Sequence, residues 1–296
     1  MSDFQHWAGD IQQRMELVLD SLLPSPDIAP QRLHEAMRYA SLGGGKRVRA
    51  LLAHAAGEFC GTRKETVEAA AAAVELIHAY SLVHDDMPCM DDDDLRRGKP
   101  SCHKQYDETI ALLVGDTLQT LAFQILSAPG LLPKAEHQLE MVQLLAVASG
   151  SRGMAGGQAI DLASVGKNLT QTELEYMHIH KTGALIRAAA LLGAYGSESP
   201  EPARIQAVDT FAQSIGLAFQ VVDDILDAEA DTATLGKTAG KDADANKPTY
   251  VTILGLKRAR DLAAELHATA IESLMAYGSE AERLRQLAHY ITQRSF

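Results

Sequence analysis

The sequence of 296 residues predicts an all-α protein. Its abundant Ala, Leu, Glu and Gln favour helix, whereas the aromatic residues that favour strands make up only 5% of the chain. Apolar residues recur at helical spacing along nearly the whole chain. We therefore expect a single domain, residues 1–296, in which the helices form a bundle around a central cavity.

Prolines and glycines mark the ends of the expected helices. Pro24, Pro26 and Pro30 follow the first helix, and the glycines at 43–45 separate the second from the third. The stretch 249–254 also has the composition of a strand, but no other segment offers it a partner. The helices expected in chain order are residues 3–22, 31–41, 46–60, 64–86, 104–127, 134–153, 171–192, 201–227, 248–277 and 280–294.

The composition limits the classes of function. The chain has 27 Lys and Arg against 39 Asp and Glu, a net charge of −12, which disfavours a nucleic-acid surface and suits cation binding. Three cysteines without metal-ligand spacing, Cys60, Cys89 and Cys102, indicate free thiols in a reducing compartment. The N-terminus lacks the pattern of a signal peptide, and no apolar run reaches the ~18 residues of a membrane span. We therefore expect a cytoplasmic enzyme that neither binds nucleic acid nor spans a membrane.

Two dense aspartate clusters are the strongest functional signal, and each ends an apolar helical stretch. Carboxylates this close repel one another and rarely persist beside a core without a cation. Ligands that are all oxygen favour Mg²⁺, Mn²⁺ or Ca²⁺ over zinc or copper. We expect the clusters to hold Mg²⁺ ions against a diphosphate, although residues 92–94 fit a solvated acidic loop equally well. The first cluster consists of Asp85, Asp86 and Asp91 to Asp94, and the second of Asp223, Asp224 and Asp227.

Spacing decides how each cluster could share an ion. Asp223 and Asp227 are four residues apart, so they lie on one face of a helix, one turn from each other. Asp85 and Asp91 are six apart and align poorly on a regular helix. Pro88 stands between them, and we expect it to end the helix and let the chain turn back toward Asp85.

Basic residues accompany both clusters. The segment that opens with glycines 43–45 and continues into Lys46 resembles a P-loop only superficially, because it lacks the G-x-x-x-x-G-K-[ST] pattern and a preceding strand. A flexible turn that opens a helix is nevertheless a good anion site, since its N–H groups have no helical partner. Arginine forks, lysine charges and bridging magnesium together indicate one site for diphosphates. The basic residues are Lys46, Arg47, Arg49, Arg96, Arg97, Lys99, Lys181, Lys237, Lys241 and Lys247.

These motifs closely resemble those of the trans-isoprenyl diphosphate synthases, in particular the bacterial farnesyl diphosphate synthases. They occur in the order typical of that family and cover about residues 34–250, which makes the resemblance far more specific than any single motif. The matching stretches are 43–49 (GGGKRVR), 75–78, 84–100 (HDDMPCMDDDDLRRGKP), 180–183 (HKTG), 219–227 (FQVVDDILD), 236–242 and 246–250.

The resemblance implies an enzyme that condenses isoprenoid diphosphates head to tail. An allylic diphosphate (dimethylallyl or geranyl) ionises, the alkene of isopentenyl diphosphate attacks the allylic carbon, and a proton leaves to give farnesyl diphosphate. Such a reaction needs cations that stabilise the departing diphosphate and an apolar cavity that keeps water from the carbocation. No side chain has to act as the nucleophile, and the departing diphosphate can take the proton, so we assign no general base.

The resemblance also implies roles for the motif residues. A pair of Mg²⁺ ions would bind Asp85 and Asp91 with support from Asp86, and a third ion would bind Asp223 with Asp227 in its outer shell, with Mn²⁺ as a possible substitute. The allylic diphosphate would contact Arg96, Lys181 and Lys237. Isopentenyl diphosphate would contact Lys46, Arg49, His78 and Arg97. Oxygens of Thr182 and Gln220 would face the reacting carbons.

Tyr80 and Ser81 are expected to set the product length. Ser81 lies one helical turn before Asp85 on the same face, and Tyr80 is its neighbour. A bulky aromatic residue five positions before the first aspartate, together with the insertion Pro88-Cys89, is similar to the farnesyl pattern of this family. Tyr80 would then close a pocket sized for fifteen carbons, although it also fits an ordinary core residue. Because the family forms homodimers through helix faces, the resemblance further implies a homodimer.

Other assignments explain fewer of these residues. The same chemistry with another chain length, in a geranyl or geranylgeranyl diphosphate synthase, stays open. The pairs Glu75/His78 and Glu175/His178 are typical of di-iron bundles, but that alternative leaves both aspartate clusters unexplained. A terpene cyclase would not need the second diphosphate site that the basic residues indicate. A regulatory subunit of a prenyltransferase typically lacks one aspartate motif, whereas both motifs are present here. The dipeptide His84-Asp85 alone is weak support for a metal phosphohydrolase.

Overall fold

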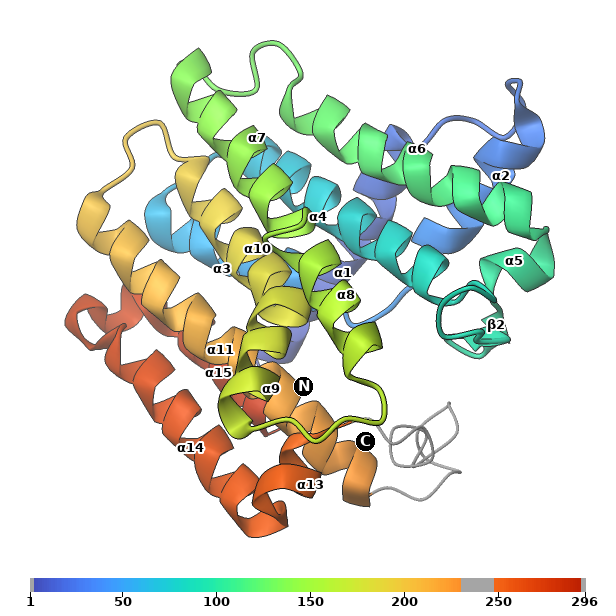
Figure 1. The fold of residues 1–296 in the computed structure, drawn as a ribbon. Helices are drawn as coiled ribbons and strands as arrows, with labels where there is room; N and C mark the ends of the chain where they lie inside the picture. The colour runs from blue at the N-terminus through green and yellow to red at the C-terminus, as the bar shows by residue number, and fades with distance from the viewer. Residues whose placement is uncertain (1–2, 230–247, 294–296) are drawn as a thin grey trace.

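A computed structural model describes residues 3–229 and 248–293, and most of these residues are helical (Figure 1). The predicted all-α fold is confirmed, and the described part adds one small two-stranded hairpin. The N-terminal half contains α1 (Asp3–Leu22), α2 (Gln31–Ser41), α3 (Val48–Cys60), α4 (Lys64–Asp85), β1 (Leu95–Arg96), β2 (Lys99–Pro100), α5 (Cys102–Gln105), α6 (Glu108–Leu126) and α7 (Ala135–Ser149). The C-terminal half contains α8 (Met154–Ser164), α9 (Gln171–His178), the π-helix η1 (Ile179–Gly183), α10 (Ala184–Tyr195), α11 (Pro202–Glu229), α13 (Tyr250–Leu254), α14 (Leu256–Glu272), the 3₁₀ segment η2 (Met275–Ala281) and α15 (Glu282–Thr292).

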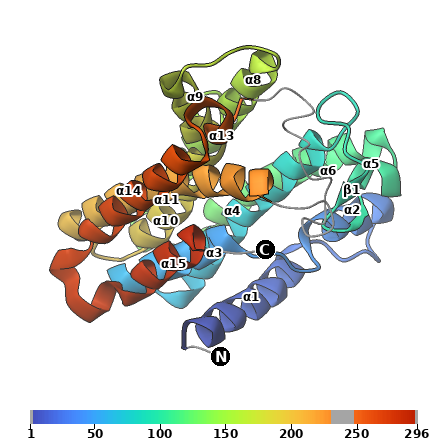
Figure 2. The same cartoon turned by 90° about the horizontal axis from the view of Figure 1, so that it is seen from below.

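Helix α4 is the centre of the bundle. It packs against α3, α6 and α10, which lie around it in Figures 1 and 2. Its alanines from Ala70 to Ala73 are fully buried, and their small side chains let the neighbouring helices come close. A helix that is apolar on most sides lies inside a fold because no face of it prefers water. The C-terminal end of α4, where the first aspartate cluster begins, is therefore held by its neighbours.

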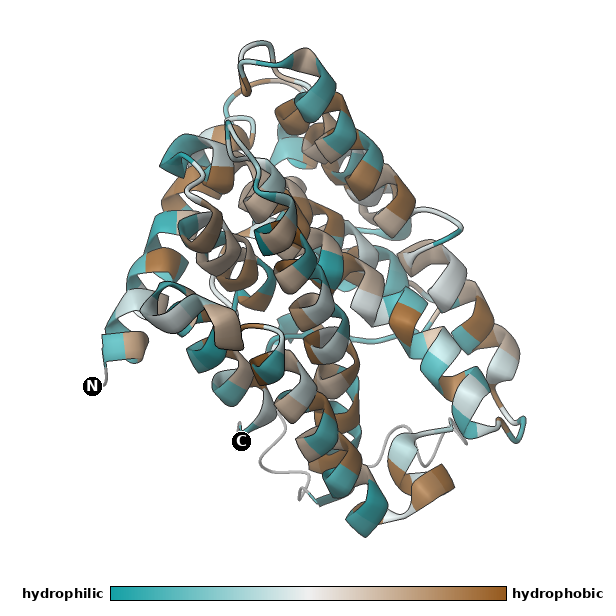
Figure 3. Ribbon diagram, turned by 90° about the vertical axis from the view of Figure 1, so that its left-hand side faces the viewer, coloured by the Kyte–Doolittle hydropathy of each residue, from teal (hydrophilic) through white to brown (hydrophobic). Residues whose placement is uncertain are grey.

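Apolar side chains form two hydrophobic clusters. The larger one surrounds α4 and includes side chains from α1, α3, α6, α7, α10 and the N-terminal part of α11. The smaller one joins α9, the C-terminal part of α11, α13 and α14, and Tyr250 is fully buried within it. The outer helices carry polar residues on their solvent side, which gives alternating teal and brown along the ribbons in Figure 3. Helix α11 contributes to both clusters and so connects them.

The prediction for residues 134–153 was wrong at its end. The helix stops at Ser149 because Gly150 takes up an extended conformation as its C-terminal cap. A further helix, α8, then begins at Met154, in a stretch where none was predicted. The spacing within α8 is helical, but the stretch is rich in small residues and glycine, which weakens the apolar pattern.

The stretch 249–254 is a helix and not a strand. Thr249 caps the short helix α13 through a capping box with Thr252, in which each side chain accepts from the other's backbone N–H. Gly255, with a φ of +78°, then separates α13 from α14. The predicted helix 248–277 is therefore divided into α13 and α14, and its last residues belong to the 3₁₀ segment η2.

Two helices are long and apolar enough to cross a membrane by length and composition alone, namely α4 and α6. In α4, 78% of the apolar window is buried inside the bundle, as in the core helix of a globular fold. In α6 the buried share is 39%, so this helix presents apolar side chains on its outer face. The expectation that no segment spans a membrane stays a prediction.

Candidate active site

The first aspartate cluster lies where α4 ends. Asp85 is the last residue of the helix, and the chain turns back after Pro88. The backbone N–H of Asp91 donates to the carbonyl oxygen of Asp85 at 2.8 Å, and the N–H of Asp93 donates to that of Asp86 at 3.1 Å. The return of the chain toward Asp85, expected from the proline, is therefore present.

The carboxylate of Asp86 is paired with Arg96. Asp86 is only 1% exposed, and both of its oxygens accept from Arg96 Nε at 3.1 Å, while Arg96 Nη2 donates to one of them as well. Such a two-pronged arginine–carboxylate pair is among the stronger polar interactions in proteins. Asp86 therefore fixes Arg96 in place, a pairing that the spacing of the motif did not predict.

Asp85 is half-buried among charged groups. Burial raises the pKa of its carboxyl, Lys181 partly offsets this effect, and Asp91 raises the pKa further, so that it reaches about 6. A carboxyl in this environment is stabilised in its ionised form by a cation bound among the aspartates. The possible metal ligands at this end of α4 are carboxylate oxygens, which fit Mg²⁺ or a similar hard ion.

A cavity of about 370 Å³ opens beside Asp85. Residues of α3, α4, α8, η1 and the loop after α4 line it, and apolar side chains such as Leu82, Met90 and Met154 form part of its wall. The cavity thus combines apolar surface with a small number of polar and charged groups. The polar lining residues are Arg49, His78, Tyr80, Ser81, His84, Asp85, Gln158, Lys181 and Thr182.

Tyr80 forms part of the cavity wall and is 8% exposed. Its ring meets the ring of His84 edge-on with 5.8 Å between the centroids. The neighbouring Ser81 donates to the carbonyl oxygen of His78 at 2.9 Å. Both residues singled out for product length therefore line the same cavity as Asp85.

The β hairpin brings an arginine to the glycine loop. Arg97 Nη1 donates to the carbonyl oxygen of Gly44 at 2.8 Å. A Cβ at Gly45 would lie 3.1 Å from the central carbon of the Arg97 guanidinium, and the φ of Gly45 is +117°, so glycine suits this position on both counts. Lys46 lies exposed in the same loop. The fold thus joins two segments that are about 50 residues apart in the sequence.

Arg49 and His78 line the cavity from α3 and α4. Burial lowers the pKa of Arg49, and the charges of Glu75 and Asp223 oppose this shift. Burial, followed by the charges of Arg49 and Arg97, holds the pKa of His78 well below its usual value, so the imidazole is neutral at pH 7. Asp223 therefore links the second aspartate cluster to this side of the cavity.

Arg47 differs from its neighbours Lys46 and Arg49. It is 5% exposed, and its guanidinium donates to Glu16 at 2.6 Å, to Glu75 at 3.1 Å and to the carbonyl oxygen of Ser41 at 2.7 Å. Its φ of +48° turns the chain at this point. Arg47 therefore holds the loop to the core.

The second aspartate cluster lies on α11. Asp223 and Asp227 are partly exposed, whereas Asp224 is buried on another face of the helix. Asp224 Oδ1 accepts from Gln220 Nε2 at 2.9 Å, and Asp224 Oδ2 accepts from the backbone N–H of Tyr250 at 2.8 Å. The middle carboxylate of this cluster therefore connects α11 to α13.

The π-helix η1 carries Lys181 and Thr182. Lys181 Nζ forms an ion pair with Asp161 of α8, and Thr182 Oγ1 donates to Gln220 Oε1 at 3.3 Å. A Cβ at Gly157 would lie 2.0 Å from the backbone nitrogen of Lys181, so only glycine allows α8 and η1 to come this close. Single π-turns within helices are rare and frequently mark functional sites.

Asp161 and Gln158 were not predicted as site residues. The signal that could have identified them is their spacing of three, which places both on one helix face in a stretch of otherwise small and apolar residues. Lys237, Lys241 and Lys247 lie outside the described residues.

Residues 30–290 match the family model described as polyprenyl synthetase. The chain belongs to the polyprenyl synthetase family. It is similar to the farnesyl diphosphate synthase of Escherichia coli, with 50% identity over 265 residues that cover 88% of this chain and 89% of that one. A solved FPP/GFPP synthase of Zymomonas mobilis shares 40% identity and a TM-score of 0.88 over 98% of this chain and 99% of its own. A geranyltransferase of Helicobacter pylori, solved in complex with magnesium and isoprenyl diphosphate, shares 31% identity and a TM-score of 0.83 over 99% of this chain and 97% of its own.

The di-iron alternative finds no support in this polyprenyl synthetase. Glu75 accepts from Arg47 and, at 3.1 Å, from the backbone N–H of Ala50, so its carboxylate is already engaged. His78 lies among arginines, which disfavour a bound cation. His178 stacks on Tyr250 with 5.5 Å between the ring centroids. Glu75 and His178 therefore belong to the packing of the bundle, and His78 lies in a cationic environment.

Proposed function

We propose that this polyprenyl synthetase is a farnesyl diphosphate synthase, which condenses isopentenyl diphosphate with dimethylallyl and then geranyl diphosphate. One observation carries the proposal: half-buried Asp85, with its raised pKa, lines the same cavity as Arg49, His78 and Lys181. Carboxylates for a metal, groups for diphosphate and apolar surface for a prenyl chain thus meet in one place. The similarity to the Escherichia coli farnesyl diphosphate synthase supports this choice of substrates.

The proposed metal is Mg²⁺, three ions in each site, with Mn²⁺ as a substitute. Asp85 and Asp91 would hold a pair, and Asp223, supported by Asp227, would hold the third. Carboxylate oxygens suit these ions, and the similar Helicobacter pylori structure contains magnesium. When bound, such ions act as Lewis acids that neutralise the departing diphosphate. Asp86 supports the site indirectly, because it fixes Arg96.

Basic side chains recognise the two diphosphates. Each contributes charge-assisted hydrogen bonds, and arginine adds its planar fork. His78 is neutral because of its lowered pKa, so it serves as a hydrogen-bond donor without adding a further charge among the arginines. The allylic diphosphate would bind Arg96 and Lys181, with Lys237 as a further candidate outside the described residues. Isopentenyl diphosphate would bind Lys46, Arg49, His78 and Arg97.

Oxygen atoms near η1 stabilise the allylic cation in this proposal. Asp224 turns the amide of Gln220 so that Nε2 points to the carboxylate and Oε1 points to Thr182. A carbonyl oxygen and a hydroxyl oxygen both present partial negative charge to a carbocation. The apolar wall keeps water away from the cation, and the departing diphosphate accepts the proton at the end of the reaction.

Tyr80 and Ser81 set the chain length in this proposal. Tyr80 would stop the growing chain at fifteen carbons, because its ring stands in the cavity wall. Geranyl and geranylgeranyl diphosphate are the alternative products.

We also propose a homodimer that acts in the cytoplasm. Neighbouring helices α6 and α7 expose large apolar side chains: Leu112 is 48% exposed, Leu113 42%, Leu139 66% and Val147 38%. Apolar residues gathered on one part of a surface typically mark a contact with another protein, and a second copy of the chain is the commonest such partner.

The decisive experiment is incubation of the enzyme with isopentenyl diphosphate, dimethylallyl or geranyl diphosphate and Mg²⁺. Chromatography of the dephosphorylated products should give mainly a fifteen-carbon alcohol, and a chelator should abolish it. Absence of condensation, or activity that does not respond to the chelator, would refute the proposed function. A different chain length with intact metal dependence would instead support one of the alternative products.

The metal ligands can be tested in the same assay. Asp85→Ala and Asp223→Ala should each lower kcat by about 10²-fold or more, since each removes a group that stabilises the charge of the transition state. Asp261→Ala, on the exposed surface of α14, serves as the control. A mild loss for either variant would reassign that aspartate to a structural role.

A further inference from the structure

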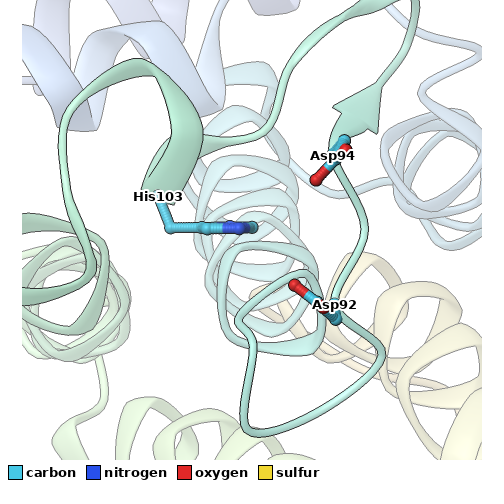
Figure 4. A group of neighbouring side chains, drawn as sticks. All are labelled: Asp92, Asp94 and His103. Atoms are coloured by element: carbon cyan, nitrogen blue, oxygen red, sulfur yellow. The ribbon is translucent and has the colours of Figure 1, made fainter.

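The later aspartates of the first cluster do not point the same way. Asp93 pairs with Arg96 at 3.7 Å, on the side of the hairpin. Asp92 has a φ of +49°, a left-handed conformation that aspartate tolerates better than most residues. Asp92 and Asp94 approach His103 of α5, and one ligand atom from each of the three lies within 4.8 Å of the others. Figure 4 shows the ring of His103 directed between the two carboxylates.

His103 supplies an independent observation. It is 7% exposed, and within the described part of the chain its buried Nε2 has no hydrogen-bond partner. A buried imidazole nitrogen without a partner is costly, so it calls for a ligand. Its other nitrogen, Nδ1, lies 3.1 Å from Ser101 Oγ. When Nδ1 donates to Ser101, Nε2 keeps a free lone pair that can bind a metal ion, as in many metal-binding histidines.

We propose that Asp92, Asp94 and His103 form a second metal site, which takes a divalent transition ion such as Zn²⁺, Mn²⁺ or Co²⁺. One imidazole nitrogen with two carboxylate oxygens suits these borderline ions better than Mg²⁺, which prefers oxygen ligands alone. The two aspartates are exposed, so water completes the coordination.

The ion would close the base of the β hairpin. Asp94 precedes β1 and His103 follows β2, and the backbone N–H of Ser101 already donates to the carbonyl oxygen of Asp94 at 2.8 Å. A metal bond across this base restrains the hairpin that carries Arg96 and Arg97. This role rests on the proposed diphosphate chemistry, whereas the metal site itself does not, so failure of the condensation assay would leave the site standing.

The ammonium group of Lys104 competes with a metal ion for the carboxylate of Asp94. Its Nζ lies 2.9 Å from Asp94 Oδ1, so an entering cation meets a positive charge next to one of its ligands. Removal of this charge should strengthen metal binding, whereas removal of a ligand should weaken it. Variants at neighbouring positions therefore have effects of opposite sign, which a general loss of structure would not produce.

The test uses the full-length protein, stripped with a chelator and titrated with Co²⁺ in the presence of excess Mg²⁺ and without diphosphates. We expect one Co²⁺ per chain to remain after dialysis. His103→Gln and Asp92→Asn should each weaken binding about tenfold or more. Lys104→Gln should strengthen it, and His137→Gln on α7 should leave it unchanged. Asp92 is exposed, so Asp92→Asn keeps the fold testable even if the buried His103 does not tolerate replacement.

Pulsed EPR of bound Mn²⁺ distinguishes this site from the proposed magnesium site, whose ligands are carboxylates. An imidazole nitrogen coupling that disappears in His103→Gln would support the assignment. Equal Co²⁺ binding by wild type, Asp92→Asn and His103→Gln, or displacement of Co²⁺ by Mg²⁺ at similar concentrations, would overturn it.

Discussion

Asp224 holds the side chain of Gln220, one helical turn before it, through a hydrogen bond of 2.9 Å from Gln220 Nε2. Its second oxygen accepts from the backbone N–H of Tyr250 at 2.8 Å. The carboxylate is buried, so both bonds are shielded from water. Asp224 therefore orients an amide of the proposed reaction region and at the same time attaches α13 to α11.

Replacement of Asp224 by Asn should weaken both the fold and catalysis. Asn keeps the size of the side chain, but its amide nitrogen donates and cannot accept from one of the two N–H groups. We expect the free energy of unfolding to fall by about 2 kcal/mol, the usual range for an unsatisfied buried polar group. The kcat should fall too, because Gln220 loses its orientation. Urea unfolding and steady-state kinetics test this, with Asp261→Asn as the control, and wild-type values in both would contradict it.

The raised pKa of Asp85 predicts that the stability of the metal-free protein depends on pH. This pKa is about 6 in the folded chain, above the ordinary value of 3.8. The folded state therefore binds the proton more tightly than the unfolded state, and stability is lost as the pH rises from about 4 through 6. Asp85→Asn removes this loss, so at pH 7 the variant should be more stable than wild type by about 2 kcal/mol. Urea unfolding in chelator should show this difference shrinking below pH 4, and a difference independent of pH would exclude the explanation.

Replacement of Tyr80 by Ala should lengthen the product. The change removes a ring from the cavity wall, so the prenyl chain can extend past this position. We expect products of twenty carbons or more in the condensation assay. Tyr80→Phe, which keeps the ring and loses only the hydroxyl, should still give fifteen carbons. If Tyr80→Ala also gave only fifteen carbons, Tyr80 would be an ordinary core residue.

Glu75→Gln should destabilise the protein strongly. The substitution leaves buried Arg47 without one of its two carboxylate partners, at a position where only 3% of Glu75 is exposed. Removal of one member of a buried pair typically costs about 3 kcal/mol or more. Glu265→Gln, which breaks an ion pair with Arg258 on the surface of α14, should cause no measurable change. Thermal and urea unfolding of the two variants side by side make the comparison.

The sequence predicted the parts of the fold that depend on residues close to one another along the chain. Helices α4 and α11 follow from helical spacing, and Pro88 predicts where the chain turns back because proline removes a backbone donor. The hairpin of β1 and β2 was not predicted, because its strands have two residues each and show no alternation.

The spacing of residues along the sequence could not predict which charged side chains pair across the fold. Lys46 and Arg47 are adjacent in one basic segment, yet the first is exposed and the second is buried against Glu16 and Glu75. The backbone at Arg47 decides this difference, and its positive φ leaves no mark in the pattern of charges. The pairing of Arg96 with Asp86 likewise depends on the path of the loop between them.

The π-helix η1 lies where one continuous helical path passes from the smaller hydrophobic cluster to the larger. Leu174 and Met177 before it belong to the first, and Leu185 and Ile186 after it belong to the second. None of the residues of η1 is itself buried, so neither core depends on their side chains. Replacement of Lys181 or Thr182 should therefore impair the proposed catalytic contacts while the two hydrophobic clusters stay packed.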